Sequence, residues 1–353
     1  MTGTHTPLLS VRDLKTYFFS DEGVVKAVDG ASFDVHAGRT LGIVGESGCG
    51  KSVTARSILR IVEEPGRIVG GEILLRQQAS SELDLAKLNP NGRHIRSIRT
   101  GVIAYVFQEP MTSFSPVHTI GNQIVEAIRF HRKTSSREAH ERGVELLQRV
   151  GIPRPRERMD EYPFQLSGGL RQRAMIAMAL SCDPKLLIAD EPTTALDVTT
   201  QAQILDLLSD LQAQTGMAVV LITHNLGVVA EMADDVVVMY LGRVVEQGPV
   251  EDIFYSPKHP YTRLLLQSIP SVHSTARQKL PTISGSIPHP YNRPHGCPFH
   301  PRCPSYIPGV CEAREPELLS VTDHQKVSCF LYAPSAVGSQ LSANSHGALK
   351  ADR

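Results

Sequence analysis

The sequence has no tryptophan, few aromatic residues and no excess of either charge. Its 353 residues include 5% aromatics, and Lys plus Arg and Asp plus Glu both number 36. Proteins that bind nucleic acids through bulk electrostatics carry a positive excess and often aromatic platforms for bases, so the composition disfavours that class. We therefore expect no nucleic-acid partner.

Long hydrophobic runs are also missing. A wholly apolar stretch such as Met217–Ile222 is short, whereas a membrane-spanning helix needs about 20 apolar residues. The N-terminus lacks the charged and apolar regions of a signal peptide. The sequence therefore predicts a cytosolic protein that could dock on a membrane protein.

The sequence does have the composition of a soluble globular protein, with 41% hydrophobic and 20% charged residues. Short apolar strands alternate with helical patterns, which predicts an α/β fold with a parallel sheet covered on both faces. Alternating residues in 8–36 predict antiparallel strands, and 77–99 looks like an irregular surface insertion. The expected strands of the sheet are 40–45, 102–107, 186–190 and 218–223, followed by an antiparallel pair over 235–241 and 243–247; the expected helices include 51–62, two within 119–150, and 198–214.

Proline and histidine become frequent after about residue 256, and four of the six cysteines lie there. We expect a small module over 256–335, poor in helix and core, and a disordered tail over 336–353. In a reducing cytosol a metal site is a better explanation for the cysteines than disulfides. No C-x-x-C pair is present, which lowers the expectation of a zinc ribbon. The four are Cys297, Cys303, Cys311 and Cys329.

The segment GESGCGKS, residues 45–52, fits the pattern of a phosphate-binding loop between a strand and a helix. Its glycines let backbone N–H groups surround phosphates, Lys51 neutralises phosphate charge, and the Ser52 hydroxyl is a ligand for Mg²⁺. A chance glycine loop is a weak alternative because the flanking strand and helix are those the mechanism needs. The residues expected to bind nucleotide here are Gly45, Ser47, Gly48, Cys49, Gly50, Lys51, Ser52 and Val53.

Two carboxylates follow the apolar strand 186–190. We expect Asp190 to hold Mg²⁺ and Glu191 to polarise the attacking water. Taken alone, such a pair is often only a solvated strand end.

Ser167, Gly168 and Gly169 lie at the start of another expected helix. The purely structural explanation is that these residues cap the helix. The alternative is a second anion site at a helix N-terminus. One chain cannot easily aim both anion sites at one phosphate, but two chains that face each other can.

Together, the phosphate loop, LSGG and LLIADE resemble the ATP-binding subunits of ABC transporters in order and spacing. This resemblance implies a RecA-like ATPase core in residues 1–255, with an antiparallel β subdomain and a helical subdomain over about 111–183. It also implies that Gln108 senses Mg²⁺ and the membrane subunit, that His224 contacts the γ-phosphate, and that Phe18 stacks on adenine, with Tyr17 as its near alternative. Residues 195–197 resemble the D-loop.

The segments GESGCGKS, QEPMTSFSP, HPYTRLLLQSIP and GCPFHPRCP resemble the oligopeptide, dipeptide and nickel branch of ABC importers. This implies ATP-driven solute uptake at the cytoplasmic face of the inner membrane. The implied partners are two permeases, a second identical or paralogous ATPase subunit, and an external solute-binding protein. Peptides are the favoured solute, with nickel, opines or oligosaccharides as alternatives. The resemblance also favours a 4Fe–4S cluster over zinc at the four cysteines. A soluble ABC ATPase without a permease is the other functional class, but such chains usually have two cassettes or a long coiled coil.

Overall fold

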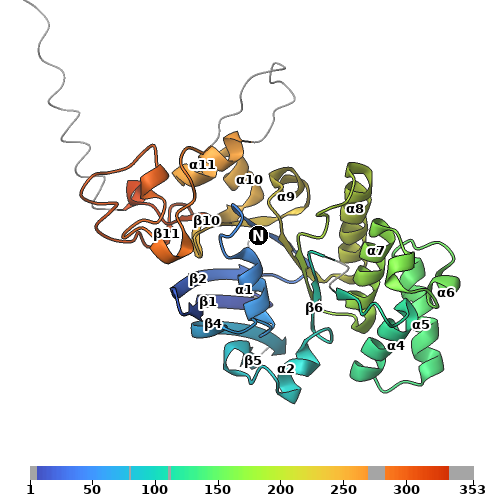
Figure 1. Cartoon of the computed structure of the whole chain (residues 1–353). Coiled ribbons are helices and arrows are strands. Elements are labelled where there is room, and N and C mark those ends of the chain that lie inside the picture. The colour runs from blue at the N-terminus through green and yellow to red at the C-terminus, as the bar shows by residue number, and fades with distance from the viewer. Residues whose placement is uncertain (1–5, 79–80, 110–112, 269–282, 334–353) are drawn as a thin grey trace, which may run out of the picture.

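The computed structural model describes residues 6–78, 81–109, 113–268 and 283–333, whose strands form two sheets (Figure 1). The larger sheet has a parallel centre with the strand order β9-β3-β8-β7-β6, as expected for continuous apolar strands. Antiparallel strands β10, β12 and β11 extend it at the β9 edge. The strands are β3 (Thr40–Val44), β6 (Ile103–Val106), β7 (Leu186–Asp190), β8 (Ala218–Ile222), β9 (Asp235–Tyr240), β10 (Arg243–Pro249), β11 (Leu319–Ser320) and β12 (Lys326–Val327).

The smaller sheet is antiparallel, in the order β2-β1-β4-β5. Its apolar face shares one core with helix α1 and the strands of the larger sheet. The Thr16 and Ser57 hydroxyls join β1 to α1 within that core, with their oxygens 2.8 Å apart. These elements are β1 (Leu9–Ser20), β2 (Gly23–Val35), β4 (Gly66–Gln78), β5 (Ser81–Asp84) and α1 (Lys51–Ile58).

The expectation of an irregular insertion over 77–99 is wrong. The segment contains β5, a 3-10 turn at Leu85–Lys87 and helix α2 (Arg93–Ile98). Leu85, Ile95 and Ile98 are buried there, although polar residues surround them in the sequence. Leu83, Ala86 and Leu88 pack partly buried against the same core, and these apolar residues are spaced too irregularly to give a periodic signal.

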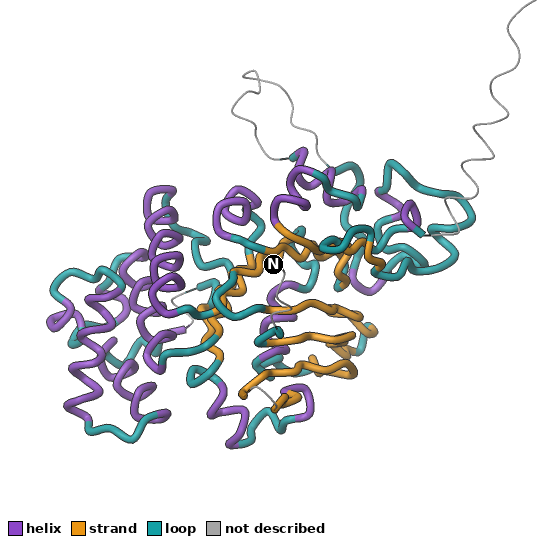
Figure 2. Tube along the Cα trace, turned by 180° about the vertical axis from the view of Figure 1, so that it is seen from behind, coloured by secondary structure: helices purple, strands orange, loops and turns teal. Residues whose placement is uncertain are grey.

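A helical subdomain packs at the β6 end of the larger sheet and lies apart from the C-terminal segment in both views (Figures 1 and 2). The side chains of Thr119 and Ser135 cap its first two helices, which breaks the predicted 119–150 region into two. The expected start of this subdomain near residue 111 lies outside the described residues. Its helices are α4 (Ile120–His131), α5 (Ser136–Arg149), α6 (Pro155–Arg158) and α7 (Gly168–Ala179), and α8 (Val198–Thr215) shares their core.

The segment after residue 256 forms more structure than its composition suggests. It contains helix α11 (Pro260–Gln267) as well as β11 and β12, and its Tyr261 and Phe299 are fully buried against α9 (Leu226–Met232), β9 and α10 (Val250–Tyr255). The expectation of poor helix and poor core is therefore wrong for the described part, because a few large aromatics supply the core. The expected tail lies outside the described residues. Among the described helices, none is long and apolar enough to cross a membrane.

Candidate nucleotide site

The phosphate loop joins β3 to α1 and runs against other backbone segments so closely that it needs glycine. A Cβ on Gly45 would lie 2.2 Å from the Met239 carbonyl oxygen, and one on Gly50 would lie 2.2 Å from that of Ala27. Both glycines also have positive φ angles, at 151° and 101°. On Gly48 (φ 77°) a Cβ would meet nothing within 4 Å, so the loop is open on that side.

Lys51 begins α1 and directs its ammonium back along the loop. Its Nζ donates to the carbonyl oxygens of Gly45 (2.8 Å) and Glu46 (3.2 Å), and the residue is 6% exposed. A buried cation with uncharged partners is well suited to attract an anion. Cys49 is buried, and burial raises the pKa of its thiol, so it acts in the loop as a small apolar residue.

Ser52 and Asp190 meet between α1 and the end of β7. The Ser52 hydroxyl donates to Asp190 Oδ1 at 3.0 Å, and the Tyr105 hydroxyl donates to Oδ2 at 2.6 Å. Burial raises the pKa of Asp190, while these two hydrogen bonds act against that rise. A hydroxyl and a carboxylate at this distance fit Mg²⁺, which prefers oxygen ligands. Val53, the next residue on α1, packs partly buried against the core.

Glu191 lies directly after β7 and receives contacts from three segments. Gln108 Nε2 donates to its Oε2 at 2.8 Å, the Thr194 hydroxyl donates to the same oxygen at 2.9 Å, and His224 Nδ1 lies 3.2 Å from Oε1. Its backbone has φ 47°, an uncommon conformation for a residue with a side chain. The structure thus brings together three of the residues selected from the sequence, Gln108, Glu191 and His224. Gln108 contacts the carboxylate of Glu191; its expected role at Mg²⁺ stays a prediction.

Ser167, Gly168 and Gly169 form the N-terminus of α7. Ser167 is the N-cap, its Oγ accepting from Leu170 N at 3.4 Å, and both Ser167 and Gly168 are exposed. A Cβ on Gly169 would lie 2.8 Å from Thr200 Cγ2, so glycine allows α8 to approach. Helix α7 lies apart from α1 in both views (Figures 1 and 2). One chain therefore keeps α7, whose start was expected to be the second anion site, apart from the helix of the phosphate loop.

The two aromatic residues proposed for adenine differ in their surroundings. Phe18 is half-buried on β1, and a Cβ on Gly66 would lie 2.5 Å from its ring. Tyr17 donates to Asp29 Oδ1 at 2.6 Å, and burial followed by this contact raises its pKa to about 12. Tyr17 is thus held by a carboxylate, whereas Phe18 is not, which favours Phe18 as the residue able to stack on a base.

The comparisons with known proteins agree with this geometry. Residues 28–194 match the ABC transporter family model, and residues 245–311 match the model of the oligopeptide/dipeptide transporter C-terminal region. A probable peptide ABC transporter ATP-binding protein of Sinorhizobium fredii is 50% identical over 92% of this chain and 94% of its own length. The chain belongs to the ABC transporter ATP-binding proteins. This confirms the resemblance and the α/β ATPase core expected from the sequence, and the ABC cassette is an ATPase.

Other relatives and solved structures agree. An oligopeptide transport ATP-binding protein of Bacillus subtilis is 50% identical over 92% of this chain and 97% of its own. A dipeptide transport ATP-binding protein of Escherichia coli is 45% identical over 91% and 96%. The dimeric ATP-binding cassette solved in a post-hydrolysis state with ADP and Pi superposes with a TM-score of 0.60 at 25% identity, covering 69% of this chain and 98% of that one.

The C-terminal cysteines of this ABC protein are neighbours, but they form no metal site as placed. Cys297 N donates to the Cys311 carbonyl at 2.7 Å, and burial, with the nearby cysteines adding to it, raises the pKa of Cys297 to about 11 and of Cys329 to about 12. Across the described ranges, no group of three or more His, Cys, Asp or Glu side chains could hold a metal ion. The expected iron–sulfur or zinc centre is therefore not supported by the described residues.

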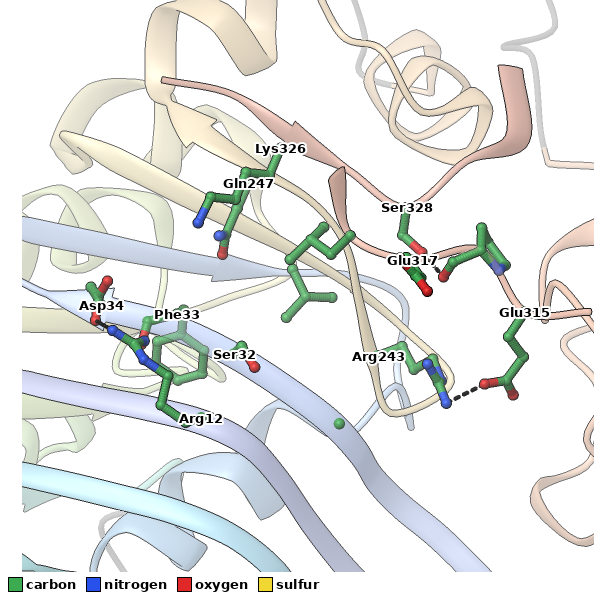
Figure 3. Close-up of a pocket in the computed structure, with 14 residues that line it drawn as sticks. Arg12, Ser32, Phe33, Asp34, Arg243, Gln247, Glu315, Glu317, Lys326 and Ser328 are labelled. Atoms are coloured by element: carbon green, nitrogen blue, oxygen red, sulfur yellow. Dashed lines mark hydrogen bonds and ion pairs between the residues drawn. The ribbon is translucent and has the colours of Figure 1, made fainter. Parts of the chain in front are cut away.

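A cavity of about 610 Å³ lies away from the phosphate loop, between the smaller sheet and the C-terminal segment (Figure 3). Arg12 with Asp34, and Arg243 with Glu315, form ion pairs at its wall. None of the expected nucleotide-binding residues lines it. It is not the ATP site of the ABC cassette.

Sequence reasoning missed four residues that touch the ATP site. Tyr105 lies within an expected buried strand, and Tyr261 and Arg302 lie in the Pro-rich segment that the sequence predicts to be poor in core. Thr194 could have been found, because a threonine three residues after a carboxylate often bonds to it locally. For the other three, no local pattern carries the signal, since their partners are distant in sequence.

Proposed function

We propose that this chain is the ATP-hydrolysing subunit of an ABC importer that takes up oligopeptides or dipeptides. The relatives named above are peptide, oligopeptide and dipeptide transport proteins and align with more than nine-tenths of the chain. The ATP site does not contact the solute and so cannot indicate the solute class. The match to the oligopeptide/dipeptide C-terminal region supports that class instead.

The phosphate loop binds the nucleotide in this proposal. Backbone N–H groups of residues 45–50 surround the phosphates, Lys51 supplies the cation, and Phe18 stacks on adenine. Ser52 and Asp190, with Gln108, are the Mg²⁺ ligands. The metal, when bound, neutralises phosphate charge during transfer.

Hydrolysis is assigned to Glu191. Its carboxylate orients the attacking water and accepts its proton, while Gln108 and Thr194 fix the carboxylate through hydrogen bonds of 2.8 and 2.9 Å. His224 Nδ1 lies 3.2 Å from the other oxygen of Glu191, and we assign it the contact with the γ-phosphate.

The second anion site acts on a different chain. Ser167, Gly168 and Gly169 are exposed or partly exposed and lie apart from α1 of the same chain (Figure 1). We assign them to the γ-phosphate of ATP bound by a second ATPase subunit, identical or paralogous, in a head-to-tail dimer. Two permeases and an extracytoplasmic solute-binding protein complete the importer, and the chain sits peripherally at the cytoplasmic face of the inner membrane.

The observation that supports hydrolysis most directly is the Glu191 carboxylate held by three side chains beside the Ser52–Asp190 pair. We expect Glu191→Gln to lower ATP turnover by ~10²–10⁴-fold, the usual contribution of a positioned base, with nucleotide binding retained. Phosphate release and binding of a fluorescent ATP analogue measure the two effects. Glu231→Gln, an exposed glutamate on α9, is the control. Turnover of Glu191→Gln at the wild-type rate would remove Glu191 from this role.

The solute class needs its own test. Cells that lack the gene for this chain should lose uptake of labelled dipeptides and oligopeptides and regain it with the wild-type chain, but not with Glu191→Gln. Restored uptake of nickel or an oligosaccharide, without peptide uptake, would contradict the peptide proposal.

The four C-terminal cysteines carry a finer proposal. We propose a 4Fe–4S cluster, with zinc as the alternative, on Cys297, Cys303, Cys311 and Cys329. Its support is that three of the cysteines belong to one core cluster and that Cys329 lies close enough to interact with all three. The side chains would have to converge further than they do here, so the centre would form together with local rearrangement.

A further inference from the structure

The C-terminal segment reaches the phosphate loop at Glu46, the second residue of the loop. Arg302 binds the Glu46 side chain, and the Tyr261 hydroxyl accepts a hydrogen bond from the Glu46 backbone N–H at 2.9 Å. These partners lie 256 and 215 residues away from Glu46 in the sequence. One loop residue is therefore held twice by a part of the chain outside the residues matched by the ABC transporter family model.

The Arg302–Glu46 pair is bidentate, and its arginine is buried. Nη1 lies 2.7 Å from Oε2 and Nη2 lies 3.0 Å from Oε1, and the Arg302 side chain is 4% exposed. Two further contacts hold the guanidinium: Nε donates to the Ser284 carbonyl at 3.2 Å, and Nη1 also donates to the Tyr240 hydroxyl at 3.3 Å. A buried arginine held by a bidentate carboxylate and two further acceptors has a fixed position, since any displacement leaves its charge unpaired.

Tyr261 is equally constrained. It is fully buried, and its ring packs against Tyr240 at 4.8 Å and Phe299 at 5.3 Å between centroids. Its own backbone N–H is capped by His259 Nδ1 at 3.0 Å. The hydroxyl that meets the loop therefore has a defined position and little freedom to follow the loop if the loop moves.

Glu46 is also held from the nucleotide side. Its carbonyl oxygen accepts from Lys51 Nζ, the cation expected to meet the phosphates. The C-terminal segment therefore binds Glu46 through the side chain and backbone N–H of Glu46, and Lys51 binds it through the carbonyl of Glu46. A shift of Glu46 would move an acceptor of Lys51 and, with it, the position of the ammonium.

We propose that Arg302 and Tyr261 are positioning residues of the ATP site, which hold the phosphate loop through Glu46 in the conformation that binds nucleotide. This inference rests on the proposed nucleotide-binding role of the loop. Neither residue touches the nucleotide; both act through Glu46 and Lys51.

The test uses the full-length chain and equilibrium binding of a fluorescent ATP analogue with Mg²⁺. We expect Arg302→Met and Glu46→Gln each to weaken binding roughly tenfold, as for the loss of one partner of a buried ion pair that shapes a site. The double variant should be no weaker than the worse single variant, because both remove the same interaction. Tyr261→Phe, which deletes only the hydroxyl, should weaken binding several-fold, and Arg302→Lys should restore part of the affinity.

The control separates positioning from general stabilisation. Arg293 is another mostly buried arginine of the C-terminal segment, but it pairs with Asp29 on β2 (2.6 Å). Arg293→Met should lower the unfolding midpoint without weakening nucleotide binding. Hydrogen exchange at residues 45–50 should rise in Arg302→Met and Tyr261→Phe, but not in Arg293→Met.

Binding within twofold of wild type in both Arg302→Met and Tyr261→Phe would overturn the inference, as would equal losses in Arg293→Met. If Arg302→Met does not fold, Arg302→Lys and Tyr261→Phe carry the same comparison. A wild-type chain that binds no ATP would instead refute the proposed function, so the two failures are distinguishable.

Discussion

The hydroxyl of Tyr105 should determine the pH below which Mg²⁺-dependent ATP binding is lost. It donates to Asp190 Oδ2 at 2.6 Å, and Asp190 is 2% exposed. Burial raises the pKa of Asp190, and the hydrogen bonds from Tyr105 and Ser52 act against this rise. Tyr105→Phe removes one of these donors and keeps the ring, so the pKa of Asp190 should rise further.

The size of the effect follows from the contact. A hydrogen bond to a charged group contributes about 1.5–3 kcal/mol. Its loss should disfavour the ionised form of Asp190 by about that amount and so raise the pKa of this carboxyl further. Protons compete with Mg²⁺ for the carboxylate, and the midpoint of Mg²⁺-dependent ATP binding should therefore move to higher pH.

Tyr105→Phe should also change how the free energy of unfolding depends on pH. Because the folded-state pKa of Asp190 lies above its ordinary value, ionisation of this group costs stability as the pH rises through that window. Tyr105→Phe increases this cost, so its deficit in the free energy of unfolding should be largest above the raised pKa and should shrink as the pH falls and Asp190 is protonated.

Nucleotide titrations with Mg²⁺ and with EDTA across pH, together with denaturant unfolding at each pH, measure both effects. Tyr332→Phe is the control, because its hydroxyl donates to the Lys258 carbonyl at 3.3 Å, away from Asp190. An unchanged pH midpoint of binding in Tyr105→Phe, or a stability deficit that does not depend on pH, would refute the reasoning.

Two further predictions follow from the site and the C-terminal segment. Lys51→Ala should abolish nucleotide binding in its own site, because the phosphate charge is left without its cation. If the ATPase is a homodimer with shared sites, a mixed dimer with a Ser167→Arg chain keeps one of its two sites intact, so a random equal mixture should regain about a quarter of wild-type activity. Verified mixed dimers without any activity would contradict this. Anaerobically purified protein should be brown with about four irons per chain if Cys297 and its three partners hold a 4Fe–4S cluster; colourless protein with one zinc selects the alternative, and metal-free protein removes both.

The parallel sheet could be predicted because its strands are short apolar runs with clear ends. Strand β7 has the expected bounds, Leu186–Asp190, since the run is wholly apolar and polar residues flank it. The phosphate loop was predictable because Gly45, Gly50, Lys51 and Ser52 follow a fixed short spacing in the sequence. The carbonyls of Met239 and Ala27, which leave no room for a Cβ at Gly45 and Gly50, are distant in sequence, but their effect is visible as glycines within the loop.

Constraints between distant residues were not predictable. The Pro-rich segment after residue 256 looked poor in core, yet Tyr261 and Phe299 are fully buried in it. Arg302 gave no signal either, because an arginine between prolines reads as a solvated loop residue. Its proposed role depends on Glu46, 256 residues away, and no sequence pattern around either residue indicates that the two form a pair.

The arrangement of the two anion sites has a consequence for how hydrolysis is controlled. The first N–H groups of α7 have no partner within their helix, as at any helix start, and the Ser167 cap is long at 3.4 Å. The N-terminus of α7 can therefore accept an anion without first breaking a strong contact. In the proposed dimer that anion belongs to a facing chain, so the phosphate loop and Lys51 can bind ATP in an open subunit while the charge of the γ-phosphate stays only partly compensated. Closure of two chains supplies the missing donors, so hydrolysis should depend on dimer formation far more steeply than nucleotide binding does.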